Sequence, residues 1–505
     1  MSSFTTKVGI DDMAVYVPQL VFSVQSLAAA RHLEYDKLHK GLGLTAMAMP
    51  DTYEDAATMA ANAVLELIQK NKLYPHTIGR LYIGTESGLD GSKPIASYVV
   101  GMLTQYFENQ YGANCFLQCD AVDLTFACIG AVDALQNTLD WVKGSPERVG
   151  IVVATDFAKY ELGSGGEYTQ GAGAVAMLIR QQPRLLAISD TWGVATVDVH
   201  DFFKPIRRVK RADAITQALE LLNLELPNPQ VEPTPIQSSP AQGVFDSTDE
   251  WIQLHRDTPI FDGQYSNRCY QERIRQAYQN FLGAALGAVN SHAGPVLLGR
   301  WQRLVFHLPY AYHGRRIFME IYLEEAIKAG KQAQIEEETG TPIPVFEDWE
   351  SYLKLVSKTA GYQEFVKKYI EKGERASSLV GNIYTGSILL SLMSSLEIDL
   401  QEDADLTHAK IGFFAYGSGS KSKVFEGELQ PQWKEIVRRF NLMECLKNRK
   451  EISYETYEAL HRGQLEQSVT SPKNTFVLQK IGKDPLMPGV RRYQYVLAAV
   501  MGSAR

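Results

Sequence analysis

The stretch that decides the fold is DLTFACIGAVDAL, residues 123–135, in which an apolar, strand-like segment leads directly into an amphipathic helix. Apolar residues recur at helical spacing from Ile129 onward, so the helix begins near Cys128. A thiol at a helix start lies at the positive end of the helix dipole, among free backbone N–H groups that favour a thiolate and can hold an oxyanion. The alternative is that Cys128 is a small buried hydrophobe beside the core.

Strand-like and helix-like segments alternate on both sides of this stretch. Such alternation is typical of a layered α/β architecture rather than of separate helical and sheet domains. We expect helices over 54–71, 93–106 and from 128 onward, a strand or loop over 120–126, and core strands over 80–86, 151–156 and 173–180.

Five prolines between residues 226 and 243 prevent regular structure and predict an extended connector or surface loop. They divide the chain into an N-terminal half, 1–205, a connector, 206–250, and a C-terminal half, 251–505. The charged segment 331–375 is interpreted as a peripheral insertion. No repeat of 20 to 50 residues is visible, although two halves of similar layering would form a repeat too degenerate to see.

Composition excludes several classes of protein. With 505 residues, 45% of them hydrophobic and 21% charged, the chain can bury a large core and is not intrinsically disordered. It contains no run of roughly 18 apolar residues and no signal-peptide pattern at its start, so we expect a cytoplasmic protein without a membrane span. A net charge of −8 argues against binding of nucleic acid, but does not exclude a small anionic ligand.

The cysteines show no metal-binding pattern. Five cysteines in a long chain suit reduced thiols. Cys115, Cys119 and Cys128 follow one another without a companion histidine, at spacings that match no common zinc site. We therefore predict no metal.

Two further side chains are placed at the ends of predicted strands. His307 follows the apolar run of RLVFHLPY, residues 303–310, and precedes a proline that must end it. Glu86 ends RLYIGTE, residues 80–86, where partial desolvation raises a carboxyl pKa toward the range useful for proton transfer. The alternatives are a core histidine bonded to backbone and an ordinary surface glutamate.

Two glycine-rich segments, GEYTQGAGAVA at 166–176 and FAYGSGSKSK at 414–423, complete neither a dinucleotide-binding motif nor a P-loop. They suit close backbone approach, or presentation of the Ser418 N–H to a carbonyl oxygen. Asn382, in GNIYTGS at 381–387, could bond a thioester carbonyl or cap the helix that follows.

Taken in order, seven segments resemble the hydroxymethylglutaryl-CoA synthases of the thiolase superfamily. The resemblance spans most of the chain and implies a thiolase-like α/β fold, layered αβαβα and made of two similar halves. The segments are GTES–LD at 84–90, DLTFACIGAVDAL at 123–135, ATDFAKY at 154–160, GGEYTQGAGAVAM at 165–177, FHLPY at 306–310, GNIYTGS at 381–387 and YGSGS at 416–420.

The resemblance also implies roles for individual residues. It makes Cys128 the nucleophile acylated by acetyl-CoA, Glu86 the general acid/base and His307 the residue that holds the second acyl thioester. The implied substrate-binding residues are Asp156 and Tyr160 beside the acetyl group, Asn382 near the acetoacetyl carbonyl, Tyr384, and Ser418, which with Cys128 supplies the backbone donors of the oxyanion hole.

The implied reaction is condensation of acetyl-CoA with acetoacetyl-CoA through an acetyl-cysteine, followed by hydrolysis, for the mevalonate pathway of isoprenoid biosynthesis. It needs a nucleophile, a base and oxyanion donors, and no metal or redox cofactor. The resemblance suggests a homodimer.

The closest rival is a β-branching synthase of polyketide pathways, which takes its acceptor from an acyl carrier protein. A decarboxylating ketoacyl synthase would need two histidines, or a histidine and an asparagine, around the cysteine, and the Glu86 motif argues against it. A non-catalytic binding or assembly subunit would have no structural need for Cys128, Glu86 and His307 together.

The residues that bind the CoA phosphates are harder to place. The family commonly has a lysine after FHLPY, whereas this chain continues AYHGRR, so Arg315 or Arg316 are candidates. A second basic cluster contains Arg207 and Arg208 and continues to residue 211; its alternative interpretation is an ordinary solvated face.

Overall fold

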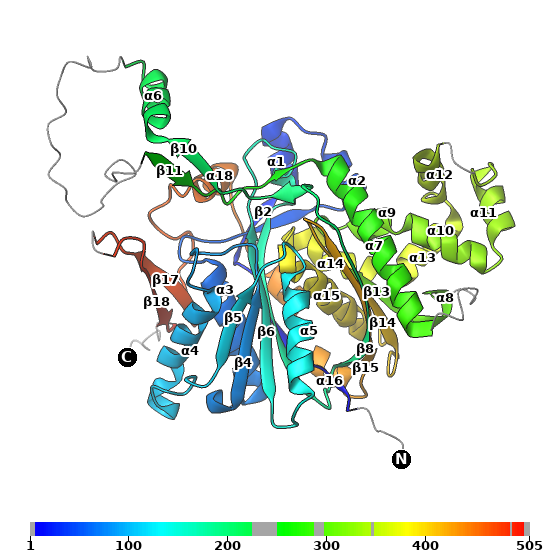
Figure 1. Cartoon of the computed structure of the whole chain (residues 1–505), viewed down its shortest axis with the longest axis horizontal. Helices are drawn as coiled ribbons and strands as arrows, with labels where there is room; N and C mark the ends of the chain where they lie inside the picture. The colour runs from blue at the N-terminus through cyan, green and yellow to red at the C-terminus, as the bar shows by residue number, and fades with distance from the viewer. Residues whose placement is uncertain (1–5, 225–249, 287–296, 345–347, 485–486, 499–505) are drawn as a thin grey trace, which may run out of the picture.

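The computed structural model describes residues 6–224, 250–286, 297–344, 348–484 and 487–498 (Figure 1). The proline-rich connector predicted between 226 and 243 lies outside the described residues. Within the described ranges, no helix combines the length and the apolarity that a membrane crossing requires.

Five strands form the sheet of the first half. β5 and β6 both run parallel to β4, whereas β6–β7 and β7–β1 are antiparallel. In spatial order the strands are β1 (Val8–Tyr16), β7 (Gly171–Gln181), β6 (Val149–Ala158), β4 (Ile78–Gly84) and β5 (Asp120–Leu124).

Four further strands repeat this pattern and form the sheet of the second half, although β8 lies at Leu186–Thr196, before the boundary predicted at residue 205. β13 is parallel to β14, and the pairs β14–β15 and β15–β8 are antiparallel. Their order is β13 (Arg303–Phe306), β14 (Lys410–Gly417), β15 (Lys421–Leu429) and β8 (Leu186–Thr196). Because β1 also pairs with β8, at Gly9–Ala187 and Ile10–Leu186, the two halves join in one nine-stranded sheet. The prediction of two similar halves is confirmed.

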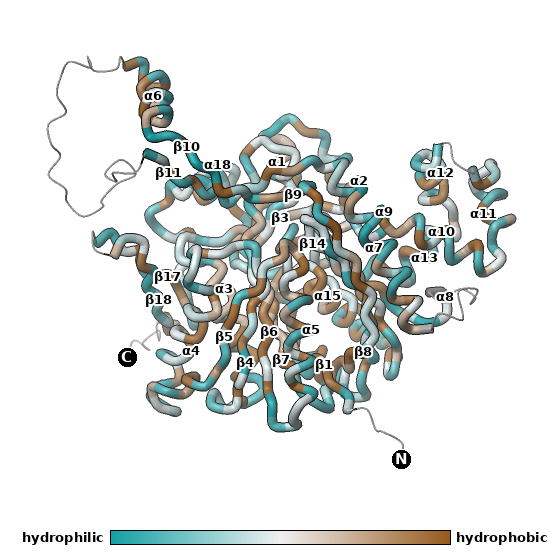
Figure 2. Tube along the Cα trace, in the orientation of Figure 1, coloured by the Kyte–Doolittle hydropathy of each residue, from teal (hydrophilic) through white to brown (hydrophobic). Residues whose placement is uncertain are grey.

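Helices complete the predicted αβαβα layering. α5 (Gly130–Val142) and α15 (Ser387–Gln401) share one core cluster with the inner faces of both halves. α3 (Ala56–Asn71) and α4 (Ile95–Tyr111) cover the outer face of the first half, and α7 (Gly263–Leu286) packs on β8 and β15 of the second. Figure 2 shows the hydrophobic residues gathered along the central strands.

The strands are hydrophobic on both faces because both faces are covered. In β7, Val175 and Met177 belong to the central cluster with α5, and Ala176 and Leu178 to the outer cluster with α3. A side-chain period of two in a doubly covered strand produces the continuous apolar run GAVAMLI rather than an alternation.

The predicted elements differ from the observed ones mainly at their ends. The helix expected over 54–71 begins at Ala56, because Asp55 caps it by accepting a 2.9 Å hydrogen bond from the Thr58 N–H. The strand expected over 80–86 is β4, which ends at Gly84. Glu86 therefore lies in the loop beyond the strand.

The segment 331–375, predicted to be a peripheral insertion, divides into two parts. α11 (Gln332–Thr339), α12 (Trp349–Val356) and α13 (Ala360–Tyr369) lie at the edge of the molecule (Figure 1) and contribute apolar residues to the cluster around α7. α14 (Glu371–Val380) instead packs along α15 in the central layer.

The remaining elements surround this frame. Those of the first half and the arm that projects from it are β2 (Leu20–Ser23), α1 (Val24–Arg31), α2 (Tyr35–Leu42), β3 (Ala46–Met49), β9 (Phe202–Phe203), β10 (Arg207–Lys210) and α6 (Arg211–Leu221). Those of the second half are β11 (Trp251–Leu254), β12 (Ile260–Phe261), α8 (Leu297–Arg300), α9 (His313–Ile317), α10 (Met319–Lys328), α16 (Trp433–Val437), α17 (Leu442–Lys447), β16 (Lys450–Glu451), α18 (Tyr454–His461), β17 (Thr475–Ile481) and β18 (Arg491–Val496).

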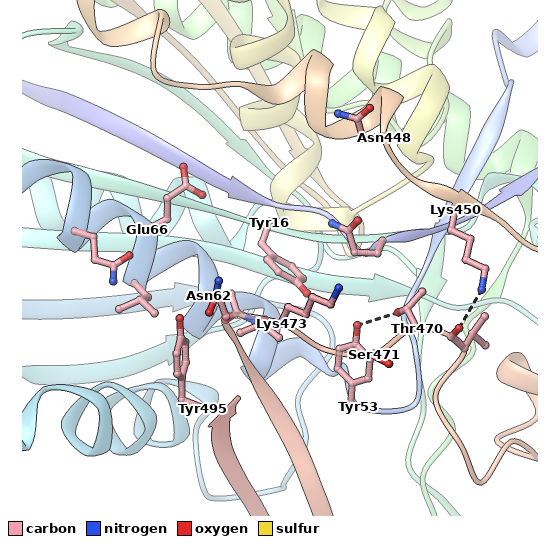
Figure 3. Close-up of a pocket in the computed structure, with 16 residues that line it drawn as sticks. Tyr16, Tyr53, Asn62, Glu66, Asn448, Lys450, Thr470, Ser471, Lys473 and Tyr495 are labelled. Carbon is pink, nitrogen blue, oxygen red and sulfur yellow. Dashed lines mark hydrogen bonds between the residues drawn. The ribbon is translucent and has the colours of Figure 1, made fainter. Parts of the chain in front are cut away.

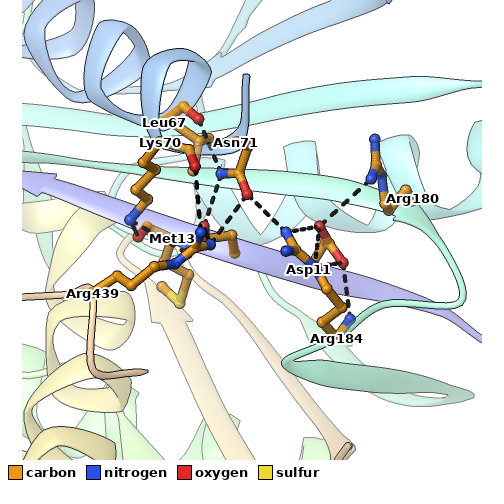
Figure 4. Close-up of polar contacts among 9 residues, drawn as sticks. Asp11, Met13, Leu67, Lys70, Asn71, Arg180, Arg184 and Arg439 are labelled. Atoms are coloured by element: carbon orange, nitrogen blue, oxygen red, sulfur yellow. Dashed lines mark hydrogen bonds and ion pairs between the residues drawn. The ribbon is translucent and has the colours of Figure 1, made fainter. Parts of the chain in front are cut away.

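Two buried aspartates fasten the first strand to its neighbours (Figure 4). Asp11 is 1% exposed and accepts a 2.6 Å hydrogen bond from Arg184 Nη2. Asp12 is fully buried, accepts hydrogen bonds from Asn71 and Arg439, and lies 3.3 Å from Lys70 Nζ. Because Arg439 follows α16 of the second half, the Asp12 cluster links the two halves.

We predict that Asp12→Asn lowers the free energy of unfolding by about 3–5 kcal/mol, because it leaves two cations near a buried site without their partner. Asp36→Asn, which breaks the exposed pair with Lys40, serves as the matched control and should cost less than about 1 kcal/mol. Urea denaturation measures both. Equal effects of the two substitutions would contradict the role of Asp12.

Candidate active site

Cys128 lies in the tight turn between β5 and α5. Ala127, immediately before it, has a φ of 40°, a left-handed conformation that is strained for alanine. α5 begins at Gly130, two residues after the thiol, so Cys128 is at a helix start, as the sequence pattern predicts. Cys128 is 8% exposed. The strained turn directs this side chain into a cavity of about 240 Å³.

Three glycines allow this turn to touch two strand ends. A Cβ on Gly84 would lie 2.0 Å from Ala131 N, and one on Gly130 would lie 2.7 Å from Leu124 O. A Cβ on Gly417 would lie 2.5 Å from Phe126 O. Only glycine permits such approaches. They place the end of β4, the start of α5 and the end of β14 around one point.

Glu86 and Cys128 form a hydrogen-bonded pair at that point. The thiol donates to Glu86 Oε1 across 2.7 Å. Burial raises the pKa of Glu86 to about 7, with the nearby Lys204 opposing the rise. Burial, with the adjacent Glu86 carboxylate, also raises the pKa of Cys128 well above its ordinary value. The expectation of a thiolate stabilised by the helix start is therefore wrong for the resting site, which holds a thiol beside a carboxyl poised near neutrality.

Asp156 holds the Glu86 loop in place. Its Oδ1 accepts hydrogen bonds from Glu86 N at 2.7 Å and Ser87 Oγ at 3.0 Å, and its Oδ2 accepts one from Thr385 N at 3.0 Å. The side chain is fully buried and does not line the cavity. The resemblance placed Asp156 beside the acetyl group, whereas its observed contacts fix the position of Glu86, because both carboxylate oxygens are occupied by the protein.

His307 enters the cavity from the end of β13. Ser387 Oγ lies 2.5 Å from its Nδ1 and accepts a 3.1 Å hydrogen bond from Leu308 N. Burial lowers the pKa of His307 to about 3, so the imidazole is neutral at physiological pH. The Ser387 hydroxyl thus ties the imidazole to the backbone of the residue that follows it and fixes the orientation of the ring.

Aromatic rings form much of the cavity wall. The ring of Tyr160 lies 5.5 Å from that of Phe261 and 6.4 Å from those of Phe202 and Tyr384, between centroids. These rings enclose Cys128 in an apolar cluster. Such walls exclude water and strengthen the electrostatic interactions inside. The predicted residues that line the cavity are Cys128, Tyr160, His307, Arg316, Asn382, Tyr384 and Ser418.

Asn382 and Tyr384 belong to one tight turn. Asn382 Oδ1 accepts a 2.8 Å hydrogen bond from Tyr384 N. Tyr384 has a φ of 40° and begins the short 3₁₀ helix Tyr384–Gly386 before α15. The side-chain carbonyl oxygen of Asn382 therefore has the predicted capping role. The same side chain also lines the cavity.

The four arginine candidates for CoA phosphates are in different places. Arg315 is partly exposed and its guanidinium is paired with the buried carboxylate of Glu374. Arg316 lines the cavity and lies over the Tyr310 ring. Arg207 and Arg208 lie on β10 of the projecting arm and do not line the cavity.

Sequence reasoning missed three residues of the site. Asp201 is fully buried and accepts hydrogen bonds from Tyr416 Oη at 2.7 Å and Gly419 N at 2.8 Å, which fixes the loop of Ser418. Lys204 reaches the Glu86 loop, and Ser387 holds His307. Two of them lie in DFFKP, residues 201–205, where a carboxylate and an amine flank two aromatic residues ahead of a proline, a pattern that could have been noticed.

A larger cavity, of about 780 Å³, lies between α3 and the segment before β17 (Figure 3). Tyr16, Tyr53, Lys450 and Lys473 are among its lining residues, and Tyr53 Oη lies 3.2 Å from Thr470 Oγ1. Neither Cys128 nor His307 borders it.

The two free thiols nearest Cys128 in sequence, Cys115 and Cys119, belong to the outer core cluster, away from the thiol of the active site.

Comparison with solved structures gives the class of the fold. The chain is similar to MvaS in complex with 3-hydroxy-3-methylglutaryl coenzyme A, with 26% identity, a TM-score of 0.72, and coverage of 97% of this chain and 99% of that chain. The HMG synthase of the curacin biosynthetic pathway, 21% identical, has the same fold with a TM-score of 0.67 over 97% of this chain and 100% of that chain. The architecture is thiolase-like.

The sequence comparisons give the family. Residues 4–183 match the family described as hydroxymethylglutaryl-coenzyme A synthase N terminal, and residues 244–491 match its C terminal counterpart. The chain belongs to the hydroxymethylglutaryl-CoA synthase family of enzymes. Relatives include the hydroxymethylglutaryl-CoA synthase of Haloferax volcanii, 29% identical over 97% of this chain and 100% of the relative, and that of Enterococcus faecalis, 28% identical over 92% and 93%.

We predict that Glu86→Gln stabilises the protein at high pH only. The native pKa of about 7 exceeds the unfolded value of 4.5, so ionisation of Glu86 destabilises the native state as pH rises between these values. Gln removes this effect. The gain should be absent below the unfolded pKa, grow through the window, and level off above pH 7 at no more than about 3 kcal/mol. Urea denaturation of both proteins across this range measures it; a pH-independent difference would exclude a raised pKa.

Proposed function

We propose that this protein condenses acetyl-CoA with acetoacetyl-CoA, with water, to give hydroxymethylglutaryl-CoA and free CoA, for the mevalonate pathway. The observation that supports this best is the hydrogen-bonded pair of Cys128 and Glu86, with His307 lining the same cavity as the thiol. A thiol, a carboxyl near neutrality and a neutral imidazole supply a nucleophile, a base and a hydrogen-bond donor without any cofactor.

In the first step, the Cys128 sulfur attacks the acetyl carbonyl as its proton passes to the Glu86 carboxylate. The tetrahedral oxyanion is held by the backbone N–H groups of Cys128 and Ser418. Its collapse expels the CoA sulfur, which takes the proton back from Glu86 and leaves as the free thiol. Acetyl-Cys128 and an ionised Glu86 result.

In the second step, Glu86 removes a proton from the acetyl methyl group, and the resulting enolate carbon attacks the ketone carbon of acetoacetyl-CoA. The neutral His307, which lines the same cavity, donates a hydrogen bond to the acceptor thioester. The new alkoxide takes its proton from the protonated Glu86, so the carboxylate is restored. Water then hydrolyses the Cys128 thioester to a carboxylate and the free thiol.

The acceptor is assigned as a CoA thioester. Arg316 places a cation beside the cavity, which suits a phosphorylated substrate. The relative bound to 3-hydroxy-3-methylglutaryl coenzyme A is 26% identical over 97% of this chain, whereas the curacin relative supports the fold alone.

We predict that radiolabelled acetyl-CoA leaves acid-stable label on the wild-type protein and none on Cys128→Ala, because the thiol is the only acceptor in this mechanism. Peptide mapping locates the label. Label that persists on the alanine variant would refute the assignment. In Glu86→Ala, we expect the thiol still to become labelled, although more slowly because it has lost its proton acceptor, and condensation to fall by at least about 10²–10⁴-fold, the range for loss of a general base.

A second prediction concerns the acceptor. Purified protein should consume acetoacetyl-CoA in the presence of acetyl-CoA, followed as loss of the acetoacetyl enolate absorbance. Acetoacetyl loaded on an acyl carrier protein should react at least tenfold more slowly. Turnover restricted to the carrier-bound acceptor would make the protein a β-branching synthase instead.

A further inference from the structure

The segment Asp201 to Pro205 runs beside the cavity, which Phe202 lines. β9, Phe202–Phe203, pairs with β12, Ile260–Phe261, in a small antiparallel sheet, and Phe202 and Phe261 pack on the apolar cluster around Cys128. The residue that follows this sheet, Lys204, is partly buried. Lys204 therefore follows two residues after Phe202 of the cavity wall and lies close to the reacting groups.

Lys204 touches two components of the site. Its Nζ donates a 3.3 Å hydrogen bond to the backbone carbonyl of Glu86 and lies 4.7 Å from the centroid of the Tyr384 ring. The ammonium thus bridges the loop that holds the acid/base and the turn that holds Asn382. A cation over an aromatic face is held in place by the ring as well as by the hydrogen bond.

Among the described residues, the other groups that act most strongly on Glu86 are acidic or neutral. Asp156, on β6, and Asp201, before β9, act on it as like charges, and the Cys128 thiol donates to it. Tyr160, two residues after β6, and Tyr384, at the start of the 3₁₀ helix, face the same group. Lys204 is the positive charge among these neighbours.

We propose that Lys204 is a positioning residue for the condensation: it holds the Glu86 loop through the carbonyl of that residue and supplies the countercharge that keeps the Glu86 side chain a carboxylate. The inference rests on the proposed function in that it takes Glu86 as the base. A cavity closed by aromatic rings excludes water, which would otherwise stabilise the carboxylate. The ammonium replaces that solvation at the moment when Glu86 must accept a proton.

The direction of the effect follows from the charges. Burial raises the pKa of Glu86 to about 7 even with Lys204 in place, and Lys204 acts to lower it. Removal of the ammonium raises this pKa further, so a smaller fraction of Glu86 is ionised at neutral pH. The acid limb of the activity profile then moves to higher pH. A role in packing alone would lower the rate without moving the limb.

The experiment compares Lys204→Met, which keeps the aliphatic stem, with Lys204→Arg, which keeps the charge. The acid limb of the pH profile of kcat/KM for condensation should rise by about one pH unit or more in the Met variant, which is up to about a tenfold loss below the wild-type midpoint. The Arg variant should stay within a few tenths of a unit. Lys434→Met, which removes a remote lysine paired with exposed Asp403, is the matched control and should not move the limb.

A second readout requires no substrate turnover. Alkylation of Cys128 by iodoacetamide responds to the ionisation of its hydrogen-bond partner, so its rate profile should show the Glu86 inflection, and Lys204→Met should move that inflection upward. Thermal denaturation confirms that the variants are folded. An unmoved inflection and limb in folded Lys204→Met would overturn the inference, as would equal shifts in the Met and Arg variants. Absence of turnover in the wild-type protein would overturn the proposed function, while the alkylation profile still tests Lys204.

Discussion

The structure depends on one close approach of backbone, in which Gly84, Gly130 and Gly417 bring two strand ends and a helix start within contact distance. Gly84 and Gly130 set the contact of Cys128 with Glu86 inside the first half, whereas a longer separation of the two halves would carry Ser418, next to Gly417, away from Cys128. Each glycine is next to or two residues from a residue of the site. The chemistry of the cavity is thus decided by the absence of three β-carbons, and the buried charges of Asp11 and Asp12 keep the surrounding sheet from relaxing.

The loops of the site are held in place by hydrogen bonds to buried side chains of the protein. Asp156 fixes the Glu86 loop and Asp201 the Ser418 loop, while Ser387 fixes the ring of His307. Each of these acceptors is fully buried or nearly so, and each uses its oxygens on backbone N–H groups or hydroxyls. Preorganisation of this kind avoids reorganisation during reaction, because the dipoles already point to where charge develops. Its cost is visible in the raised pKa of Glu86.

Much of this could be predicted from sequence, for identifiable reasons. Apolar runs in doubly covered strands and helical spacing after Cys128 revealed the layers, and the motifs around Glu86 and His307 identified their strand ends. The ionisation of Cys128 could not be predicted, because it depends on burial and on a carboxylate 42 positions away. Nor could the pairing of Arg315 with Glu374, or the roles of Asp201 and Lys204, since each contact joins segments that only the folded chain brings together.

The segment from Asp201 to Lys204 connects two loops of the site. At one end it holds the loop of Ser418, and at the other it holds the loop of Glu86. Oxyanion donor and base are therefore mechanically tied by four consecutive residues, although they belong to opposite halves of the chain. Loss of either hydrogen bond therefore loosens the donor and the base together, so acyl transfer and condensation share one structural support.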